Sequence, residues 1–119
     1  MNNLLKELQA RLPPDCIQAD PEVIRSYSQD RAVFERAGTA AILVMPRSTE
    51  EVVSAVMAAN AAEVPIVPRG AGTGLTGAAN AIDGCLILSL HRMTKIVEID
   101  TTNRMVRVQP GCINSELKA

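Results

Sequence analysis

The first third of the chain shows apolar residues at helical spacing, interrupted by prolines. Three leucines fall on one side of a helix predicted over residues 3–11, and Pro13 and Pro14 end it. A second helix is predicted after Asp20, which suits the N-cap position, while Pro21 suits the first helical position. The chain therefore begins with short helices.

A strand, a helix and a second strand follow. Residues 40–46 (AAILVMP) are a nearly uninterrupted apolar run stopped by a proline, which is typical of a buried strand. Ser48 and Glu51 have the spacing of a capping box, which predicts a helix start. The apolar residues at helical spacing behind it are Val52, Ala55, Val56 and Ala59. Pro65 closes this helix and opens a short strand, PIVP, that leads into a glycine-rich loop.

The last third of the chain changes to strand-like patterns. Residues 85–90 (CLILSL) predict another apolar strand, and residues 95–111 predict a hairpin around the turn sequence DTTN. The residues that share a face within each hairpin strand are Val97 with Ile99, and Val106 with Val108. INSELKA then begins like a helix, with Asn114 or Ser115 as its cap. This order of elements predicts an α+β fold.

The composition and charge of the chain exclude several kinds of partner and site. With a net charge of −1 and only one tyrosine and one phenylalanine, the chain has neither the positive field nor the stacking platform of a nucleic-acid-binding protein. Cys16, Cys85 and Cys112 include no C-x-x-C pair, so we expect free thiols, with no disulfide framework and no metal site. No apolar run approaches the roughly 20 residues of a transmembrane segment. Charges within the N-terminal apolar stretch argue against a secretory signal, and the cytoplasm is the expected compartment.

Four glycines lie between residues 70 and 77, and the last three spell G-x-G-x-x-G. A Rossmann dinucleotide turn requires a helix after this pattern and then a parallel strand. Only AANAIDG separates Gly77 from Cys85, which is shorter than the dozen or so residues of a parallel crossover, and IDG is itself a turn signal. We therefore reject a Rossmann motif. A Walker loop is excluded because no Gly-Lys-Ser/Thr sequence closes it.

Two interpretations of the glycine-rich loop remain. It is a mobile linker, or it is a nest in which successive N–H groups converge on an anion because small side chains leave the backbone accessible. We favour the nest, since a strand feeds the loop directly and prolines flank that strand. Thr73 and Thr76 add hydroxyl donors, and Arg69 adds a permanent charge whose fork suits phosphate. Such a loop suits the diphosphate of a dinucleotide such as FAD.

Two long motifs, PIVPRGAGTGLTGAA and CLILSLHRMTKIVEIDTTNRMVRVQPG, together resemble the FAD-linked oxidase family of the p-cresol methylhydroxylase type. Within that family they look nearest to the FAD subunit of glycolate oxidase and to its D-lactate dehydrogenase relatives. YSQD and the P-x-S-T-E-E-V helix start also fit, so the resemblance covers almost the whole chain. It implies the N-terminal part of a p-cresol methylhydroxylase-type FAD-binding domain, incomplete and truncated. Residues 1–37 are then an N-terminal helical segment, and residues 38–119 are the first part of the FAD-binding domain.

The resemblance also implies that the loop binds the FAD diphosphate. The residues expected to bind the cofactor are Pro68, Arg69, Gly70, Ala71, Gly72, Thr73, Gly74, Leu75, Thr76, Gly77 and Ala78. Substrate-binding residues of the family lie in a part that this chain lacks, so no catalytic residue and no metal ligand is assigned. We interpret His91 as a turn residue, and Arg92 and Lys95 as solvated turn charges. For Gly111, close approach to the cofactor and an ordinary turn role both remain open.

By resemblance, the expected function is the FAD-binding portion of a flavin-dependent 2-hydroxy-acid dehydrogenase or oxidase of the glycolate or D-lactate type. The chain alone is expected to be inactive, because the substrate half is missing. The implied partners are FAD, a small 2-hydroxy acid in the full-length parent, and other oxidase subunits. The alternatives are a stand-alone nucleotide- or phosphate-binding module and a remnant without a ligand.

Overall fold

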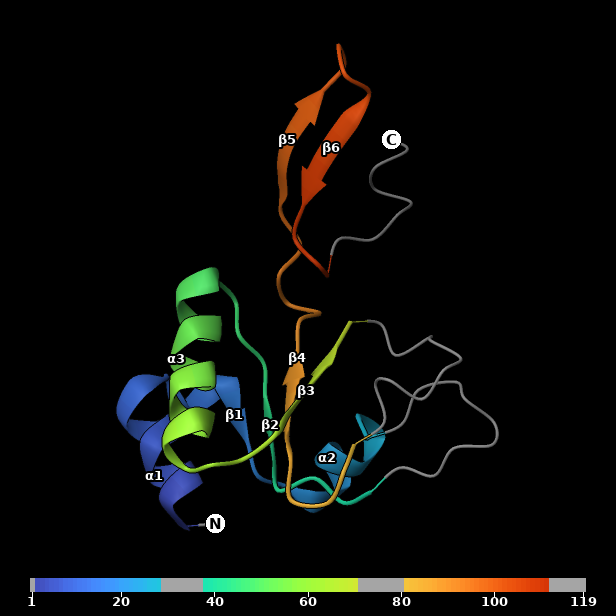
Figure 1. The fold of residues 1–119 in the computed structure, drawn as a ribbon. Coiled ribbons are helices and arrows are strands. Elements are labelled where there is room, and N and C mark those ends of the chain that lie inside the picture. Colours follow the sequence, from blue (N-terminus) through green and yellow to red (C-terminus); the bar gives the residue numbers. More distant parts are fainter. Residues whose placement is uncertain (1, 29–37, 71–80, 112–119) are drawn as a thin grey trace.

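The computed structural model describes residues 2–28, 38–70 and 81–111, and arranges them as a four-stranded sheet with a separate hairpin (Figure 1). The α-helices in these ranges are α1 (Asn2–Arg11), α2 (Pro21–Ser26) and α3 (Thr49–Ala61). The strands are β1 (Ile17–Gln18), β2 (Ile42–Val44), β3 (Ile66–Arg69), β4 (Leu86–Ser89), β5 (Ile96–Asp100) and β6 (Met105–Val108). A short 3-10 helix, Pro14–Cys16, leads into β1.

The four strands are ordered β1-β2-β4-β3, with β2, β4 and β3 parallel and β1 antiparallel to β2. The predicted strand–helix–strand unit is β2–α3–β3, and β4 lies between its two strands. The parallel pairing of β3 with β4 shows that the crossover argument from the sequence was wrong. That count began at Gly77, whereas the connection spans residues 70–85 and exceeds the dozen or so residues required. The described part of this connection, residues 81–85, contains a turn and no helix.

Helices and loops cover both faces of the sheet. On one face, leucines of α1 and alanines of α3 pack against alternate residues of β2 and β4. The buried members of this cluster are Leu4, Leu8, Leu12, Cys16, Ile42, Val44, Ala55, Ala58, Ala59, Leu86 and Leu88. The face toward α2 buries Ile24, Ala40, Leu43, Val67, Ala81, Cys85 and Ile87. Burial on both faces explains why β2 and β4 have continuous apolar sequences without polar alternation.

The predicted N-caps of α2 and α3 are confirmed. Asp20 Oδ1 accepts a hydrogen bond from the amide of Glu22 at 3.0 Å, and Ser48 Oγ accepts one from the amide of Glu51 at 3.2 Å. The Glu51 carboxylate itself accepts from the backbone N–H of Arg47 at 2.8 Å and from its guanidinium at 3.0 Å. The start of α3 is therefore fixed by both a hydroxyl cap and an ion pair.

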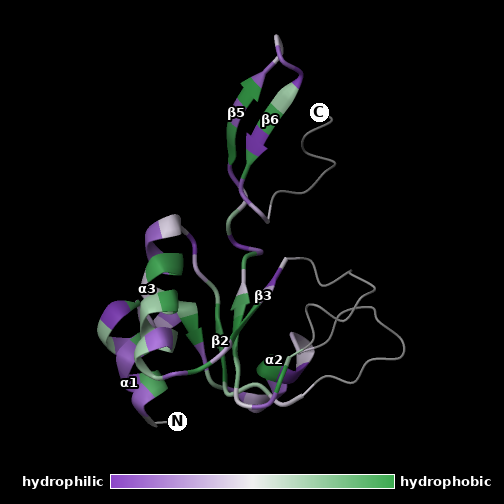
Figure 2. Ribbon diagram, in the orientation of Figure 1, coloured by the Kyte–Doolittle hydropathy of each residue, from purple (hydrophilic) through white to green (hydrophobic). Residues whose placement is uncertain are grey.

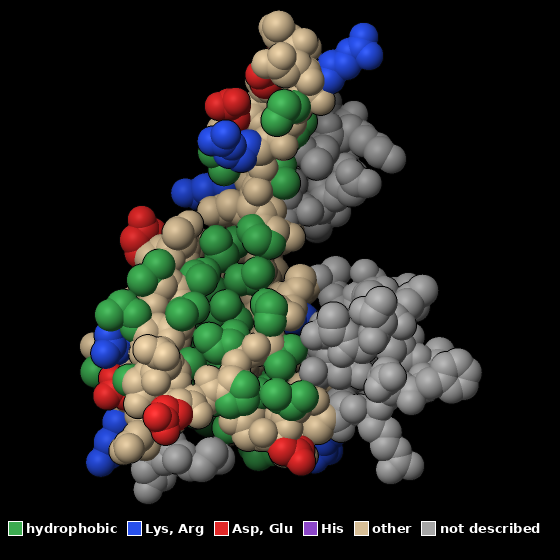
Figure 3. All heavy atoms as spheres, in the orientation of Figure 1, with side chains coloured by type: hydrophobic (Ala, Val, Ile, Leu, Met, Phe, Trp, Pro, Cys, Tyr) green, Lys and Arg blue, Asp and Glu red, His purple; other side chains and the backbone are tan. Residues whose placement is uncertain are grey.

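α3 turns mainly alanines toward the core, with Val52 partly buried beside them. Its three core alanines are fully buried, whereas Val56, predicted to face inward, is 42% exposed. Small side chains allow α1 to pack closely on α3. The helix ends at Ala61, before Pro65, and Glu63 then adopts a positive φ of 57° that stops it. Hydrophobic side chains gather on the surface over α3 and the neighbouring strands, with the charges around their margin (Figure 3).

β5 and β6 form the predicted hairpin, which projects away from the sheet (Figure 1). Its turn is held by Asp100, whose carboxylate accepts from the amide of Asn103 at 3.1 Å and from its side chain at 2.8 Å. Apolar and polar residues are mixed on both strands (Figure 2). The large apolar side chains that remain exposed are Ile96, Val97, Ile99, Met105, Val106 and Val108. The hairpin thus leaves an apolar surface uncovered.

The predicted α+β fold is confirmed. Within the predicted N-terminal segment, α1 packs on α3, and β1 extends the sheet. A division between residues 37 and 38 stays a prediction. The predicted C-terminal helix start, with Asn114 or Ser115 as its cap, lies outside the described residues, as does Cys112. Cys16 and Cys85 are buried free thiols, and burial raises the pKa of both.

Candidate functional site

The carboxyl ends of β3 and β4 lie side by side where the glycine-rich loop begins. Arg69 is paired with Ser89 in the parallel register, and the amide of Leu90 donates to the Arg69 carbonyl at 2.8 Å. Gly70 follows directly, and a Cβ added there would meet no heavy atom within 4 Å. The backbone at Gly70 therefore faces open space. Ligands of parallel sheets characteristically bind at this carboxyl edge.

Three of the predicted cofactor-binding residues are described, and they are consecutive at this edge. Pro68 and Gly70 are exposed, and Arg69 between them is half-buried. The other predicted residues lie outside the described residues: Ala71, Gly72, Thr73, Gly74, Leu75, Thr76, Gly77 and Ala78. The described part thus combines an arginine and an accessible glycine backbone, a donor set that fits a diphosphate.

Strand alternation directs the Arg69 side chain to the face of the sheet that α2 covers. Val67 and Ile87 belong to the buried cluster on that face. Residues two positions further along a strand return to the same face, so Arg69 and Ser89 also lie there. The candidate site is therefore on the side of the sheet opposite to α1 and α3 (Figure 1).

Four residues meet here, and we call them the strand-end cluster: Tyr27, Arg69, Ser89 and His91. The Arg69 guanidinium carbon lies 6.0 Å from the centroid of the Tyr27 ring, within reach of a cation–π contact. The rings of Tyr27 and His91 are 5.7 Å apart and tilted by 37°. Ser89 Oγ, which belongs to a fully buried residue, lies 2.6 Å from His91 Nδ1. The cluster forms a continuous chain of contacts from β4 to the arginine.

The environment of His91 favours the neutral imidazole. His91 is exposed at its surface, but the protein around its ring removes enough water to lower the pKa of His91, and the neighbouring positive charge of Arg92 lowers it further. A neutral ring that accepts a hydrogen bond at Nδ1 carries its proton on Nε2, and the Ser89 hydroxyl is then the donor. The predicted turn position of His91 is confirmed, but this contact to the buried serine was not foreseen.

Arg92 was expected to be a solvated turn charge, and that expectation is wrong. Its Nη1 donates to the backbone carbonyls of Asp15 at 3.1 Å and Met45 at 3.3 Å, and its Nη2 lies 3.6 Å from the Asp15 carboxylate. The hydrogen bonds and the ion pair of Arg92 therefore connect the segment after β4 to Asp15, in the 3-10 helix before β1, and to Met45, directly after β2. Lys95 is exposed, as expected.

Gly111 has a structural reason to be glycine. A Cβ at this position would lie 2.6 Å from the carbonyl oxygen of Leu90, 2.7 Å from that of His91 and 2.8 Å from that of Met93. Its amide also donates to the Met93 carbonyl at 2.7 Å. The close approach that Gly111 permits is therefore to the backbone that follows β4.

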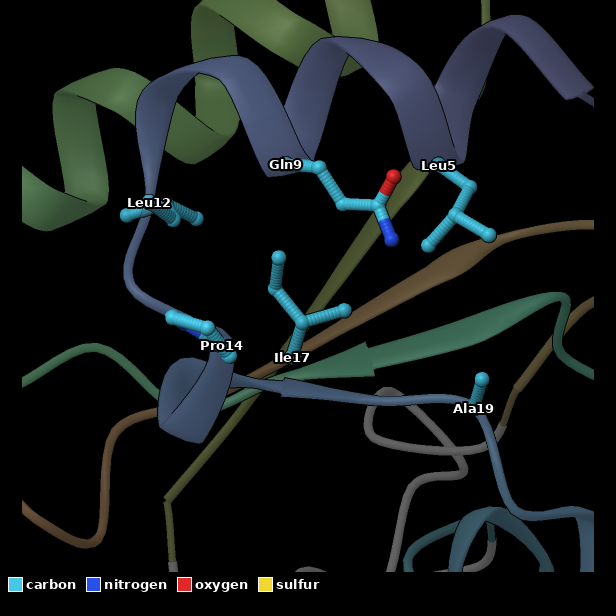
Figure 4. A pocket seen from close by; sticks show the side chains of 6 residues that line it. All are labelled: Leu5, Gln9, Leu12, Pro14, Ile17 and Ala19. Carbon is cyan, nitrogen blue, oxygen red and sulfur yellow. The ribbon is translucent and has the colours of Figure 1, made fainter.

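A separate apolar groove lies between α1 and the open edge of β1 (Figure 4). Its volume is about 430 Å³, and the side chains that line it are Leu5, Gln9, Leu12, Pro14, Ile17 and Ala19. None of these residues belongs to the predicted cofactor loop. Within residues 2–28, 38–70 and 81–111, no group of three or more His, Cys, Asp or Glu is arranged to hold a metal ion. No helix in the same ranges has the length and apolarity needed to cross a bilayer.

The parallel edge, the arginine and the accessible glycine have the features expected of a nucleotide-binding site. Comparison with known proteins makes the class specific, because a family profile described as "FAD binding domain" matches residues 40–119. The chain belongs to this family, and its cofactor is FAD.

Curated relatives support the assignment across most of the chain. D-2-hydroxyglutarate dehydrogenase of Stutzerimonas stutzeri is 33% identical over 97% of this chain and 25% of its own length. D-lactate dehydrogenase of Anaerostipes hadrus is 32% identical over 89% of this chain and 22% of its own. Glycolate oxidase subunit GlcD of Bacillus subtilis is 39% identical over 63% of this chain and 16% of its own. The resemblance drawn from the sequence is confirmed, and the chain spans a quarter or less of the length of these relatives.

Solved structures support the fold. An alkyldihydroxyacetonephosphate synthase matches 98% of this chain with a TM-score of 0.85 and 23% identity, over 24% of its own chain. p-Cresol methylhydroxylase matches 98% of this chain with a TM-score of 0.80 and 25% identity, over 23% of its own. The fold is thus that of the p-cresol methylhydroxylase-type FAD-binding domain.

Proposed function

We propose that the chain supplies the diphosphate-binding part of the FAD site in a flavin-dependent dehydrogenase or oxidase of 2-hydroxy acids, of the glycolate or D-lactate type. The single observation that carries the proposal is the position of Arg69 at the end of β3, beside the open backbone of Gly70. The relatives are named for D-2-hydroxyglutarate, D-lactate and glycolate. All three compounds are 2-hydroxy acids, which supports the proposed substrate class.

The residues of this chain bind and orient the cofactor in this proposal. Arg69 offers a planar fork to two phosphate oxygens, and Gly70 lets the diphosphate approach the main chain. The remaining proposed contacts run from Ala71 to Ala78. Bound FAD would supply the redox chemistry by accepting two electrons and a proton from the 2-hydroxy acid. Pro68 has no amide hydrogen, and its role is to fix the backbone that enters the loop.

The chain by itself is proposed to bind FAD weakly and to have no turnover. The residues of this chain suit the diphosphate side of a cofactor site, and none of them is proposed to bind the substrate or to transfer a proton. The full protein's other subunits, and the cytoplasm as its compartment, are parts of the same proposal. A dye-reduction assay with added FAD and glycolate or D-lactate tests this, and turnover by the chain alone would contradict it.

Titration of the ¹⁵N-labelled chain with FAD, ADP and pyrophosphate tests the binding directly by NMR. We expect all three ligands to shift the Arg69 and Gly70 amides, and Arg69→Ala to weaken binding by about tenfold through loss of a charge-assisted hydrogen bond. Arg25→Ala removes the same charge from the exposed surface of α2 and is the matched control. Equal weakening by both variants would show that only net charge matters.

The alternatives predict different ligand profiles. A stand-alone nucleotide module responds to ADP but not to FAD, and a remnant responds to no ligand. Either profile would contradict the proposal.

A further inference from the structure

We infer that Tyr27 and His91 are positioning residues that hold the Arg69 guanidinium ready for the FAD diphosphate without touching the cofactor themselves. The inference rests on the proposed function of Arg69 and adds a role for two residues outside the glycine-rich loop.

The first contact is between Arg69 and Tyr27. An arginine side chain loses considerable rotamer freedom when it is fixed on a ligand, and that loss reduces binding. The Tyr27 ring, 6.0 Å from the guanidinium carbon, restricts the side chain before the ligand arrives. Because Arg69 is half-buried, this contact is partly shielded from water. A guanidinium restricted in this way pays less entropy on binding a phosphate than a freely moving one.

The backbone around Tyr27 is held by hydrogen bonds. The Tyr27 amide donates to the Ile24 carbonyl at 3.1 Å, at the end of α2. The next residue, Ser28, is buried and donates through its hydroxyl to the same carbonyl at 2.7 Å. The Ser28 carbonyl in turn accepts from the Ala81 amide at 2.7 Å. Hydrogen bonds therefore connect the backbone around Tyr27 to the end of α2 and to the segment that enters β4.

The Tyr27 ring also contacts the ring of His91. The His91 ring lies 5.7 Å from the Tyr27 ring, and its Nδ1 is 2.6 Å from the hydroxyl of the buried Ser89. Ser89 is in turn the register partner of Arg69. The chain of contacts thus returns to the strand pair from which it started, and the Tyr27 ring contacts both the arginine and the histidine.

The inference predicts effects that pass through Arg69 alone. Tyr27→Leu should raise the dissociation constant for pyrophosphate and ADP by about twofold to fivefold, the size of a cation–π contact at a partly exposed site. Tyr27→Phe keeps the ring and should bind as the wild type does. His91→Ala should have a smaller effect in the same direction. In an Arg69→Ala background, Tyr27→Leu should cause no further loss.

NMR titrations of these variants with pyrophosphate and ADP measure the dissociation constants, and amide spectra establish that each variant is folded. A readout without ligand accompanies them, because a ring above a guanidinium moves the Arg69 side-chain proton signals upfield, and Tyr27→Leu should abolish that displacement. A variant that loses its native amide spectrum is replaced by Tyr27→Met, which keeps the apolar bulk without the ring.

The outcomes separate this inference from the proposed function. If Arg69→Ala weakens binding but Tyr27→Leu does not, the positioning role is wrong while the function of Arg69 stands. If Tyr27→Leu weakens binding equally with and without Arg69, Tyr27 acts by another route and the inference is wrong. If Arg69→Ala leaves binding unchanged, or the wild type binds neither ligand, the proposed function fails and the inference falls with it.

Discussion

Substitution of Gly70 separates cofactor binding from folding. Because an added Cβ meets no heavy atom within 4 Å, Gly70→Ala should cause no clash inside the protein. The φ angle of Gly70 lies outside the left-handed region, so an alanine adopts this backbone without strain. The same methyl group would occupy the space through which the diphosphate approaches the main chain. We therefore expect a chain that folds normally and binds ADP and FAD more weakly.

Gly70→Ala should therefore stabilise the fold and weaken ligand binding. Restricting the unfolded chain should raise the free energy of unfolding by about 0.4–1 kcal/mol. Displacing a phosphate oxygen from a backbone N–H should cost about 1.5–3 kcal/mol of binding, which is at least tenfold in affinity. Urea denaturation followed by circular dichroism measures the first quantity, and NMR titration with ADP measures the second.

Gly111→Ala is the control for stability, because a methyl group is predicted to fit at Gly70 and to clash at Gly111. Its Cβ would lie 2.6–2.8 Å from three backbone oxygens, so the variant should lose about 1–3 kcal/mol of stability through overpacking. Because that Cβ would press on the carbonyls of Leu90 and His91, next to the strand-end cluster, the variant is compared for stability and not for ADP affinity. The reasoning is refuted if Gly70→Ala binds ADP as the wild type does, or if it unfolds more easily than Gly111→Ala.

Three further predictions concern acid stability and association. Hydrogen bonds from Arg47 lower the pKa of Glu51 from 4.5 to about 2, so stability present above pH 4.5 should be lost as the pH falls toward 2. Glu51→Gln should cost about 1 kcal/mol near pH 7, after allowance for solvent screening, and should flatten acid denaturation curves; an unchanged curve would contradict this. Because the pKa of His91 is lowered from 6.5, the folded state resists protonation, and the free energy of unfolding should fall as the pH drops below 6.5. His91→Gln should remove this pH dependence from urea midpoints measured between about pH 7 and 5. The exposed apolar hairpin should cause the isolated chain to self-associate, and Ile99→Lys, at a position 63% exposed, should reduce this in light scattering; a monodisperse wild-type monomer would contradict it.

Local features of the fold could be predicted from the sequence because their causes are local. Asp20 and Ser48 cap helices through hydrogen bonds to amides two and three residues away. The hairpin turn is likewise closed within four residues, from Asp100 to Asn103. β1 was missed because it is only two residues long and is a strand only by virtue of its pairing with β2.

Long-range features could not be predicted, for a physical reason. The choice of alanines over Val56 for the buried face of α3 depends on how closely α1 approaches, which periodicity does not report. The parallel pairing of β3 with β4 requires a long enough connection, and its length is known only once the ends of both strands are known. Within the candidate site, Arg69 was identified from the motif, whereas Tyr27 and His91 reach it only when α2 and β4 come together in space. Strand alternation relates Arg69 to Val67 and Ser89 to Ile87 within their own strands, but only the parallel register puts Arg69 beside Ser89.

The end of β3 is proposed to bind the diphosphate of FAD. Parallel NMR titrations of the ¹⁵N-labelled chain with ADP and with adenosine test it most directly, because the two ligands differ only in the diphosphate. We predict that ADP shifts the amides of Arg69 and Gly70 and that adenosine leaves them in place. Equal shifts with both ligands, or shifts confined to the groove between α1 and β1, would contradict the account.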